Sequence, residues 1–289
     1  MKVCLACGQR FEADNWRCPD CGKSPPLNNG YLSFLPDMAE TNEGFNAGYF
    51  AQLVKLEESN FWFRSRNNLL IWALRRYFPY SKSFMEIGCG TGFVLSGIQR
   101  YFLGLKLSGS EIFSEGLDFA KRRLPDVKLF QMDARRIPFE DEFDVIGAFD
   151  VLEHIDEDEL VLLQMFRATK RDGGIILTVP QHRFLWSGVD EYSFHKRRYT
   201  RKELVEKVEG AGFKIIRVTS FVFFLLPLML FSRMRQRRSR GDFNPIAEYK
   251  IGYLLNITLE KVMGIERALI GRGLSFPAGG SLLIIAAKK

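Results

Sequence analysis

Short apolar runs alternate with amphipathic segments from about residue 82 to the end of the chain. A short apolar run between turn residues is typical of a buried strand, whereas apolar positions three and four apart indicate a helix. This pattern predicts strands at 83–87, 106–112, 127–131, 143–149, 174–180, 213–220 and 281–288. It predicts helices at 92–102, 114–124, 157–170 and 200–211. The alternation indicates an α/β protein with a parallel, doubly wound sheet and helices on both faces.

Two further segments do not follow this alternation. Residues 43–78 are predicted to be helical and to end before Pro79. Residues 222–275 are predicted to form a long insertion between the last two strands. The apolar run 221–231 at its start is about half as long as the roughly 20 residues that a spanning helix needs, and Pro227 interrupts it. We therefore do not predict a transmembrane segment there.

The start of the chain carries two C-x-x-C pairs, each followed by glycine. The four cysteines of these pairs are Cys4, Cys7, Cys18 and Cys21. Two such pairs can hold Zn²⁺ between four thiolates, so we predict a structural zinc ribbon over 1–30, with 24–30 as a linker. A redox pair or free thiols is the alternative. Because no secretory signal is apparent, we expect a reducing, cytoplasmic location.

The net charge of +7 is unevenly distributed, with basic clusters at 196–202 and 233–240. Such clusters favour an acidic partner, such as phosphate, nucleic acid or a membrane surface, although a solvated basic face is the alternative. An apolar run beside a basic run is typical of a segment that lies in a membrane interface. We therefore expect peripheral membrane contact through 221–240 at the inner face of the membrane, with packing against the core as the alternative.

A glycine loop, Glu-x-Gly-x-Gly-x-Gly over 86–92, connects the first predicted strand to a helix. Glycines let the backbone approach a ligand closely, and a helix N-terminus offers N–H groups to it. Glu111 ends the second strand and Asp133 follows the third, where carboxylates can accept hydrogen bonds from a ribose and from an adenine amine. The spacing of the third glycine departs from the dinucleotide fingerprint.

Taken in order, EIGCGTG, the acid at the strand end, the later DA and FDVLEHI resemble the class I methyltransferases that use S-adenosylmethionine, over roughly 45–220. The resemblance implies a Rossmann-like, seven-stranded sheet with an antiparallel last strand, in a domain over 43–289. The cluster 61–67 resembles a subset of the family in which an arginine, here Arg66 or Arg64, pairs with the cofactor carboxylate; a basic helix face is the alternative. The cofactor-binding residues that we expect are Arg66, Glu86, Gly88, Cys89, Gly90, Gly92, Glu111, Ile112, Asp133, Ala134 and Phe149.

The stretches 61–67 and 180–204 resemble a subset of this family, the ubiquinone-pathway-like and cell-surface-polysaccharide methyltransferases. The resemblance implies that an N-terminal helix closes over the cofactor and that the acceptor binds at the loop after the fifth strand. A hydroxyl acceptor needs a base. The three histidines of the chain all follow the fourth or fifth strand, and His195 is our first candidate base, before His154 and His182.

The sequence thus predicts an enzyme that moves a methyl group from S-adenosylmethionine to the oxygen of a small or amphipathic acceptor, such as a lipid-linked glycan or a quinone precursor. One alternative is a zinc-ribbon methyltransferase of rRNA or tRNA. Against it, the charges of the ribbon nearly balance and no NPPY-like motif follows the fourth strand, so nucleic acid is the less favoured partner. Another alternative is a scaffold that binds S-adenosylmethionine without turnover.

Overall fold

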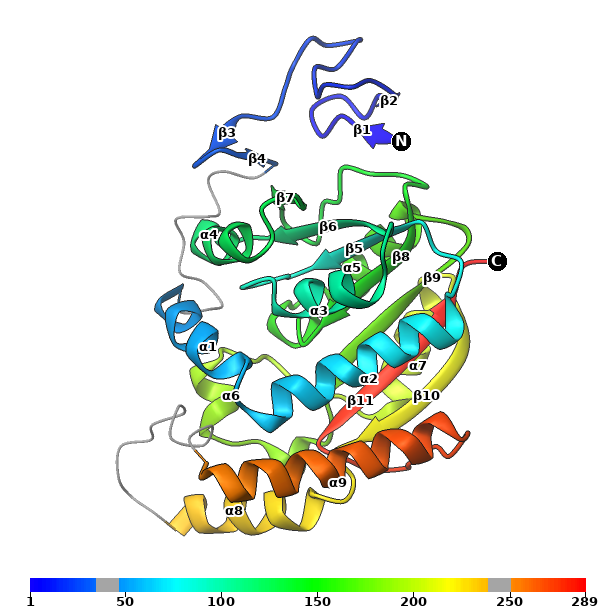
Figure 1. Cartoon of the computed structure of the whole chain (residues 1–289). Coiled ribbons are helices and arrows are strands. Elements are labelled where there is room, and N and C mark those ends of the chain that lie inside the picture. Colours follow the sequence, from blue (N-terminus) through cyan, green and yellow to red (C-terminus); the bar gives the residue numbers. More distant parts are fainter. Residues whose placement is uncertain (35–46, 239–250) are drawn as a thin grey trace.

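The computed structural model describes residues 1–34, 47–238 and 251–289 (Figure 1). A nine-stranded sheet runs through the molecule in the order β10-β11-β9-β8-β5-β6-β7-β4-β3. Its strands are β3 (Leu27–Asn28), β4 (Tyr31–Ser33), β5 (Ser83–Ile87), β6 (Lys106–Glu111), β7 (Lys128–Gln131), β8 (Phe143–Phe149), β9 (Thr169–Pro180), β10 (Lys214–Phe221) and β11 (Ser281–Ala287). The predicted α/β class and its alternation of strands and helices are confirmed.

The central part of the sheet has the predicted topology. Strands β7, β6, β5, β8 and β9 are parallel neighbours, and β11 lies antiparallel between β9 and β10. Parallel strands need crossover connections, and helices supply them here. Because the strands are parallel, the loops that follow β5, β6, β7 and β8 meet at one edge of the sheet, where ligands bind in such folds.

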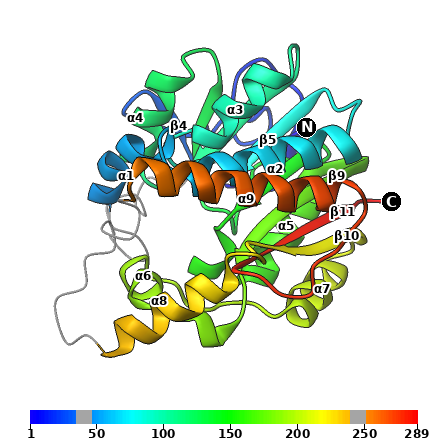
Figure 2. The same cartoon turned by 60° about the horizontal axis from the view of Figure 1, so that its bottom comes forward.

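Helices cover both faces of the sheet (Figures 1 and 2). They are α1 (Phe50–Glu57), α2 (Phe61–Tyr77), α3 (Phe93–Tyr101), α4 (Ser114–Arg123), α5 (Asp158–Ala168), α6 (Gly188–Tyr192), α7 (Arg201–Gly210), α8 (Leu226–Arg238) and α9 (Tyr253–Gly271). Buried side chains of α2, α3, α4 and α9, such as Leu74 and Leu95, join one apolar cluster. Those of α5 and α7, such as Leu162 and Leu204, join a second. The sheet thus lies between two apolar layers.

The edge of the sheet differs from the prediction. The sheet has two strands more than the expected seven, because β3 and β4 pair with each other and β4 pairs in parallel with β7. Strand β3 falls within 24–30, which we predicted to be a linker. Strands of two or three residues leave almost no periodicity in a sequence, so their pairing with β7 could not be read from it.

The helix predicted over 43–78 is interrupted. A 3₁₀ turn, η2 (Ala47–Tyr49), leads into α1, and a second helix α2 begins after Asn60; residues 43–46 lie outside the described part of the chain. Asn60 has extended backbone dihedrals, and its side-chain oxygen accepts a hydrogen bond from the N–H of Trp62 at 2.9 Å. This N-cap starts a new helix, because an asparagine in this position satisfies an orphan backbone donor.

The predicted insertion contains α8 and α9, with 239–250 outside the described residues. Figure 2 shows α9 running along α2. The two helices are joined by an ion pair between Arg64 and Glu260, and by Asn256, whose side chain accepts from Phe61 N at 2.7 Å and donates to the Ser59 carbonyl at 2.8 Å. Within the described ranges, no helix is long and apolar enough to cross a membrane.

We predict that Asn256→Ala lowers the free energy of unfolding by about 1–3 kcal/mol, because it removes two partly buried hydrogen bonds between α9 and the backbone at the start of α2. Urea titration followed by circular dichroism would measure the change. Thr258→Ala is the matched control, since its exposed hydroxyl donates to the Leu254 carbonyl of the same helix. Equal effects from the two substitutions would contradict the assigned role of Asn256.

Candidate functional site

A cavity of about 1080 Å³ opens at the edge of the sheet where β5, β6, β7 and β8 end. One half is lined by the glycine loop and by residues that follow β6 and β7. The other half is lined by α2, the loop after β9, α8 and α9. Of the predicted cofactor residues, those that line the cavity are Arg66, Glu86, Gly88, Cys89, Gly90, Glu111, Ile112, Asp133, Ala134 and Phe149. Apart from Arg66, which belongs to α2, these residues lie in the first half, which is therefore the candidate cofactor site.

The glycines of the loop have different tasks. Gly88 and Gly90 have φ values of +67° and +50°, and a Cβ on Gly88 would lie 2.5 Å from a methyl group of Val151. Gly92 is not among the described residues that line the cavity. A Cβ there would lie 3.1 Å from the Cα of Ala120, so Gly92 lets α3 pack closely against α4. The first two glycines shape the ligand loop, and the third serves helix packing.

Both strand-end acids lie in the cofactor half. The Glu111 carboxylate accepts hydrogen bonds from Ile112 N at 2.8 Å and Gly90 N at 3.1 Å, which ties the glycine loop to β6. Burial raises the pKa of Glu111, and these backbone donors oppose the shift. Asp133 is buried and receives the guanidinium of Arg135 at 2.7 Å. The carboxylate of Asp133 is thus held in a fixed orientation beside the cavity.

Glu86 is buried at the end of β5, and its Oε2 has no hydrogen-bond partner among the described residues. Burial raises the pKa of Glu86 well above its ordinary range, and the same cause raises the pKa of Cys89. A buried carboxyl that lacks a partner is costly unless a ligand or water supplies one. Glu86 therefore marks a polar contact point in the candidate cofactor site.

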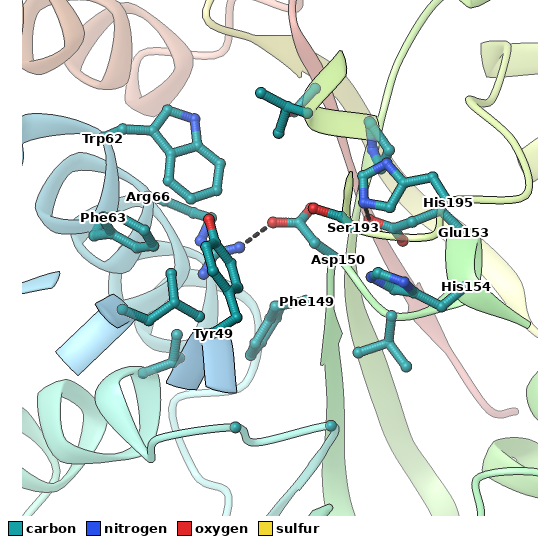
Figure 3. A pocket seen from close by; sticks show the side chains of 18 of the residues that line it. Tyr49, Trp62, Phe63, Arg66, Phe149, Asp150, Glu153, His154, Ser193 and His195 are labelled. Atoms are coloured by element: carbon teal, nitrogen blue, oxygen red, sulfur yellow. Dashed lines mark hydrogen bonds and ion pairs between the residues drawn. The ribbon is translucent and has the colours of Figure 1, made fainter. Parts of the chain in front are cut away.

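The structure distinguishes the two candidate arginines of α2. Arg66 points into the cavity, stacks on the ring of Trp62 at 4.4 Å, and forms an ion pair with Asp150 across the cavity (Figure 3). Arg64 pairs instead with Glu260 of α9. Asp150 follows β8 with a φ of +59°, a conformation that few non-glycine residues adopt. Asp150 was not among the predicted cofactor residues, although its position directly after β8 is a signal that the sequence carries.

A second polar cluster lies on the opposite side of the cavity (Figure 3). His195 Nδ1 lies 2.9 Å from Asp190 Oδ1, and its Nε2 lies 4.0 Å from Glu153 Oε1. The rings of His154 and His195 are 4.7 Å apart between centroids. One ligand atom from each of Glu153, His154 and His195 lies within 4.8 Å of the others, so the group could also hold a cation. His182 is not among the described residues that line the cavity.

The pKa values of two acids in this cluster, Asp190 and Glu153, are shifted in opposite directions. Burial opposes ionisation of Asp190, but hydrogen bonds from His195 and Arg198 hold its pKa well below its usual range. Burial and then the charge of Asp150 raise the pKa of Glu153 well above its usual range. An ionised Asp190 accepts the Nδ1–H of His195, which leaves Nε2 as the basic nitrogen. Asp190 thus orients the imidazole ring of His195 through its Nδ1.

The four cysteines of the N-terminal unit are close enough together to hold zinc. The sulfurs of Cys4 and Cys21 are 3.6 Å apart, as are those of Cys7 and Cys18. Sulfurs around a tetrahedral zinc at about 2.3 Å lie roughly 3.8 Å apart. The two turns are equivalent: Gly8 N donates to the Cys4 carbonyl at 2.8 Å, and Gly22 N donates to that of Cys18 at 3.0 Å. A closed set of four thiolates suits a structural site.

Comparisons with known proteins agree with this geometry. Residues 85–177 match a family model described as a methyltransferase domain. A probable S-adenosylmethionine-dependent methyltransferase of Mycolicibacterium smegmatis is 27% identical over 167 residues, which are 55% of this chain and 62% of that protein. The demethylmenaquinone methyltransferase of Thermotoga maritima is 26% identical over 56% of this chain and 72% of its own.

A solved structure shares the fold. A chain in the complex between the Haloferax volcanii Trm112 methyltransferase activator and the putative methyltransferase superposes with a TM-score of 0.57 at 15% identity, over 84% of this chain and 96% of that one. Residues 85–177 thus match a methyltransferase domain, and the glycine loop and the shared fold agree with that match. The chain spans 62% of the length of the Mycolicibacterium protein.

We predict that Arg66→Ala weakens the binding of S-adenosylmethionine about tenfold or more, because it removes a charge-assisted hydrogen bond in a partly buried site. Isothermal titration calorimetry would measure the dissociation constant. Arg64→Ala, on the same helix, is the control and should change affinity less than twofold. The assignment of Arg66 is wrong if the two variants bind the cofactor equally well.

Proposed function

We propose that this protein transfers a methyl group from S-adenosylmethionine to a hydroxyl of an amphipathic small molecule. The observation that carries the proposal is the composition of the acceptor half of the cavity. The His195 cluster lies on one side of it, and the other walls are mostly apolar. The apolar lining residues from the predicted insertion and its flanks are Val222, Leu225, Leu228, Met229, Ile251, Leu255 and Leu259.

The chemistry follows from the placement of His195. Bound S-adenosylmethionine would supply an electrophilic methyl group. A hydroxyl of the acceptor beside Nε2 of His195 would give up its proton to that nitrogen as its oxygen attacks. Asp190 would stabilise the imidazolium that results, because its carboxylate is already ionised and hydrogen-bonded to Nδ1. The apolar walls would hold the rest of the acceptor and exclude water from the reacting atoms.

The names of relatives are compatible with such an acceptor. The Thermotoga maritima relative is called a demethylmenaquinone methyltransferase. A quinone precursor that carries a ring hydroxyl and an apolar tail is one amphipathic molecule with the required chemistry, and a lipid-linked glycan is another. Both combine a hydroxyl for His195 with an apolar portion for the α8 and α9 walls.

We predict that His195→Ala lowers the rate of methyl transfer about 10²- to 10⁴-fold, because it removes the base, while the affinity for S-adenosylmethionine changes less than twofold. The assay uses tritium-labelled S-adenosylmethionine with a prenylated catechol, a polyprenyl-phosphate-linked sugar, or total tRNA, and counts label in each acceptor. His182→Ala is the matched control, since His182 lies outside the described lining of the cavity.

The outcomes separate the candidate functions. Label in the organic phase that depends on His195 supports the proposal. Label in tRNA would favour a nucleic-acid acceptor instead. Cofactor binding with no label in any acceptor would favour a scaffold, and an active His195→Ala variant would overturn the assignment of the base.

The open side of the acceptor half favours a lipid surface as the partner. Leu228 and Leu255 line the cavity and are 51% and 49% exposed, so the apolar wall continues outwards. Phe231 and Leu254 extend it at 61% and 79% exposure. Arg233 of α8 also lines the cavity and adds a basic group to this side of it. Exposed apolar side chains beside basic residues are suited to an anionic membrane, from which an amphipathic acceptor could enter the cavity.

We predict that the double variant Phe231→Ser/Leu254→Ser binds vesicles of phosphatidylcholine and phosphatidylserine at least tenfold more weakly than the wild type, because two apolar side chains no longer enter the interface. Co-sedimentation would measure the binding. Leu103→Ser is the control, since Leu103 is 94% exposed in a loop after α3. Wild-type binding by the double variant, or no vesicle binding by the wild type, would exclude this surface as the membrane contact.

A further inference from the structure

The N-terminal unit is built into the sheet beside the adenine end of the candidate cofactor site. Strand β4 pairs in parallel with β7, with Ser33 opposite Gln131. Asp133 and Ala134, which line the cavity, follow directly after β7. In the view of Figure 1 the unit lies beyond the β7 edge of the sheet. The chain that follows the four cysteines therefore pairs with the strand that leads into the adenine site.

Gln131 connects the two parts through its side chain. The residue is 1% exposed. Its Oε1 accepts hydrogen bonds from Ser33 Oγ at 2.6 Å and from Asn28 Nδ2 at 3.1 Å, and its Nε2 donates to the Ile112 carbonyl at 3.1 Å. Ile112 in turn donates its N–H to Glu111. A single buried amide thus joins β3 and β4 to Ile112 and, through it, to Glu111, which is expected to bind ribose; Gln131 itself does not line the cavity.

The loop between the two cysteine pairs packs under the same strand. Trp16, from this loop, lies 4.7 Å from the ring of Phe34, 5.4 Å from that of Phe139 and 6.2 Å from that of Phe130, measured between centroids. Phe34 directly follows β4, and its N–H donates to the Gln131 carbonyl at 3.0 Å. Aromatic pairs at these distances are stabilising. The position of Trp16 is therefore coupled to the position of β4 on β7.

The first residues of the chain also hold the loop that carries Asp133 into β8. Val3 N donates to the Pro138 carbonyl at 3.0 Å, and Glu140 N donates to the Met1 carbonyl at 2.9 Å. Arg136 reaches the carbonyl of Leu5, between the first two cysteines. These contacts run along the segment from Asp133 to β8, so the adenine side of the cavity is held by the N-terminal unit at several points.

We infer that Gln131 is a positioning residue through which the four-cysteine unit, with its bound zinc, sets the affinity for S-adenosylmethionine. The inference rests on the cofactor site of the proposed function, but it needs no acceptor. A unit of about thirty residues has too little core to fold alone, so metal binding supplies its folding energy. When the metal is lost, Trp16 and β4 lose their fixed positions. Gln131 then no longer holds the Ile112 carbonyl and the adjacent Glu111.

The experiment is calorimetric titration of S-adenosylmethionine into the full chain with zinc bound and after removal of zinc by a chelator. We expect removal to weaken binding about tenfold and added zinc to restore it. Gln131→Met keeps the size of the side chain but removes its hydrogen bonds. It should bind the cofactor about tenfold more weakly with zinc bound, and zinc removal should then cost less than a further twofold.

A matched pair of serines tests the route. Ser33→Ala removes the hydrogen bond to Gln131 and should weaken cofactor binding several-fold. Ser83→Ala removes the hydroxyl that bonds to Asp144 and to the Glu142 carbonyl at the start of β5, at the other end of the strand from the glycine loop, and should leave the affinity unchanged. Because Ser83 makes more hydrogen bonds than Ser33, a general loss of stability would affect the Ser83 variant at least as strongly.

Linkage gives a test that needs no variant. If zinc raises cofactor affinity by some factor, the cofactor must raise zinc affinity by the same factor. Competition with a colorimetric chelator would measure the zinc affinity of the wild type with and without saturating S-adenosylmethionine. This measurement remains valid even if the zinc-free protein unfolds. Equal zinc affinity in both conditions, or unchanged cofactor affinity in a folded zinc-free sample, would overturn the inference. If the zinc-loaded wild type binds no S-adenosylmethionine, both the cofactor site and the inference are wrong. If zinc and cofactor affinities are coupled but no acceptor is methylated, only the proposed acceptor is wrong.

Discussion

The parallel pairing of β5 with β6 and β8 is the constraint on which the site depends. It fixes the ends of three strands at one edge of the sheet, and with them the glycine loop, Glu111 and Asp150. Small displacements of any strand would move one of these groups out of reach of a common ligand. The apolar layers on both faces of the sheet hold the strands in register, so packing far from the cavity determines the geometry within it.

The buried acids of the cavity fall into two kinds, those whose carboxyl groups already have hydrogen-bond partners and those whose carboxyl oxygens lack them. Backbone N–H groups stabilise the Glu111 carboxylate, and Arg198 with His195 stabilises that of Asp190. Glu86 and Glu153 are equally buried, yet carboxyl oxygens of both lack hydrogen-bond partners among the described residues. A buried polar group without a partner is expensive, so its retention is expected where a ligand completes it. One of these acids faces the cofactor half of the cavity and the other faces the acceptor half.

Periodicity predicted the central strands and most helices because each buries an apolar face and is long enough to show its repeat. The short β3 and β4 could not be predicted, since their pairing depends on a distant edge at β7. The sequence also left open whether Arg64 or Arg66 faces the cofactor, because residues two apart on a helix point in different directions. The structure decides between them, since Arg64 pairs with Glu260 of the neighbouring helix α9. Gly92 looked like a ligand glycine, but its partner is Ala120 on another helix.

The ion pair between Arg66 and Asp150 connects these observations to ligand binding. It crosses the cavity between α2 and the end of β8, with side chains that are 12% and 22% exposed. Separating such a pair without compensation leaves two poorly solvated charges, which is strongly unfavourable. The methionine portion of S-adenosylmethionine carries one carboxylate and one ammonium group. It can therefore replace the pair by giving Arg66 an anion and Asp150 a cation, so that no charge is left alone. A ligand with only one of these groups would leave either Arg66 or Asp150 unpaired, and the cavity would discriminate against it for that reason.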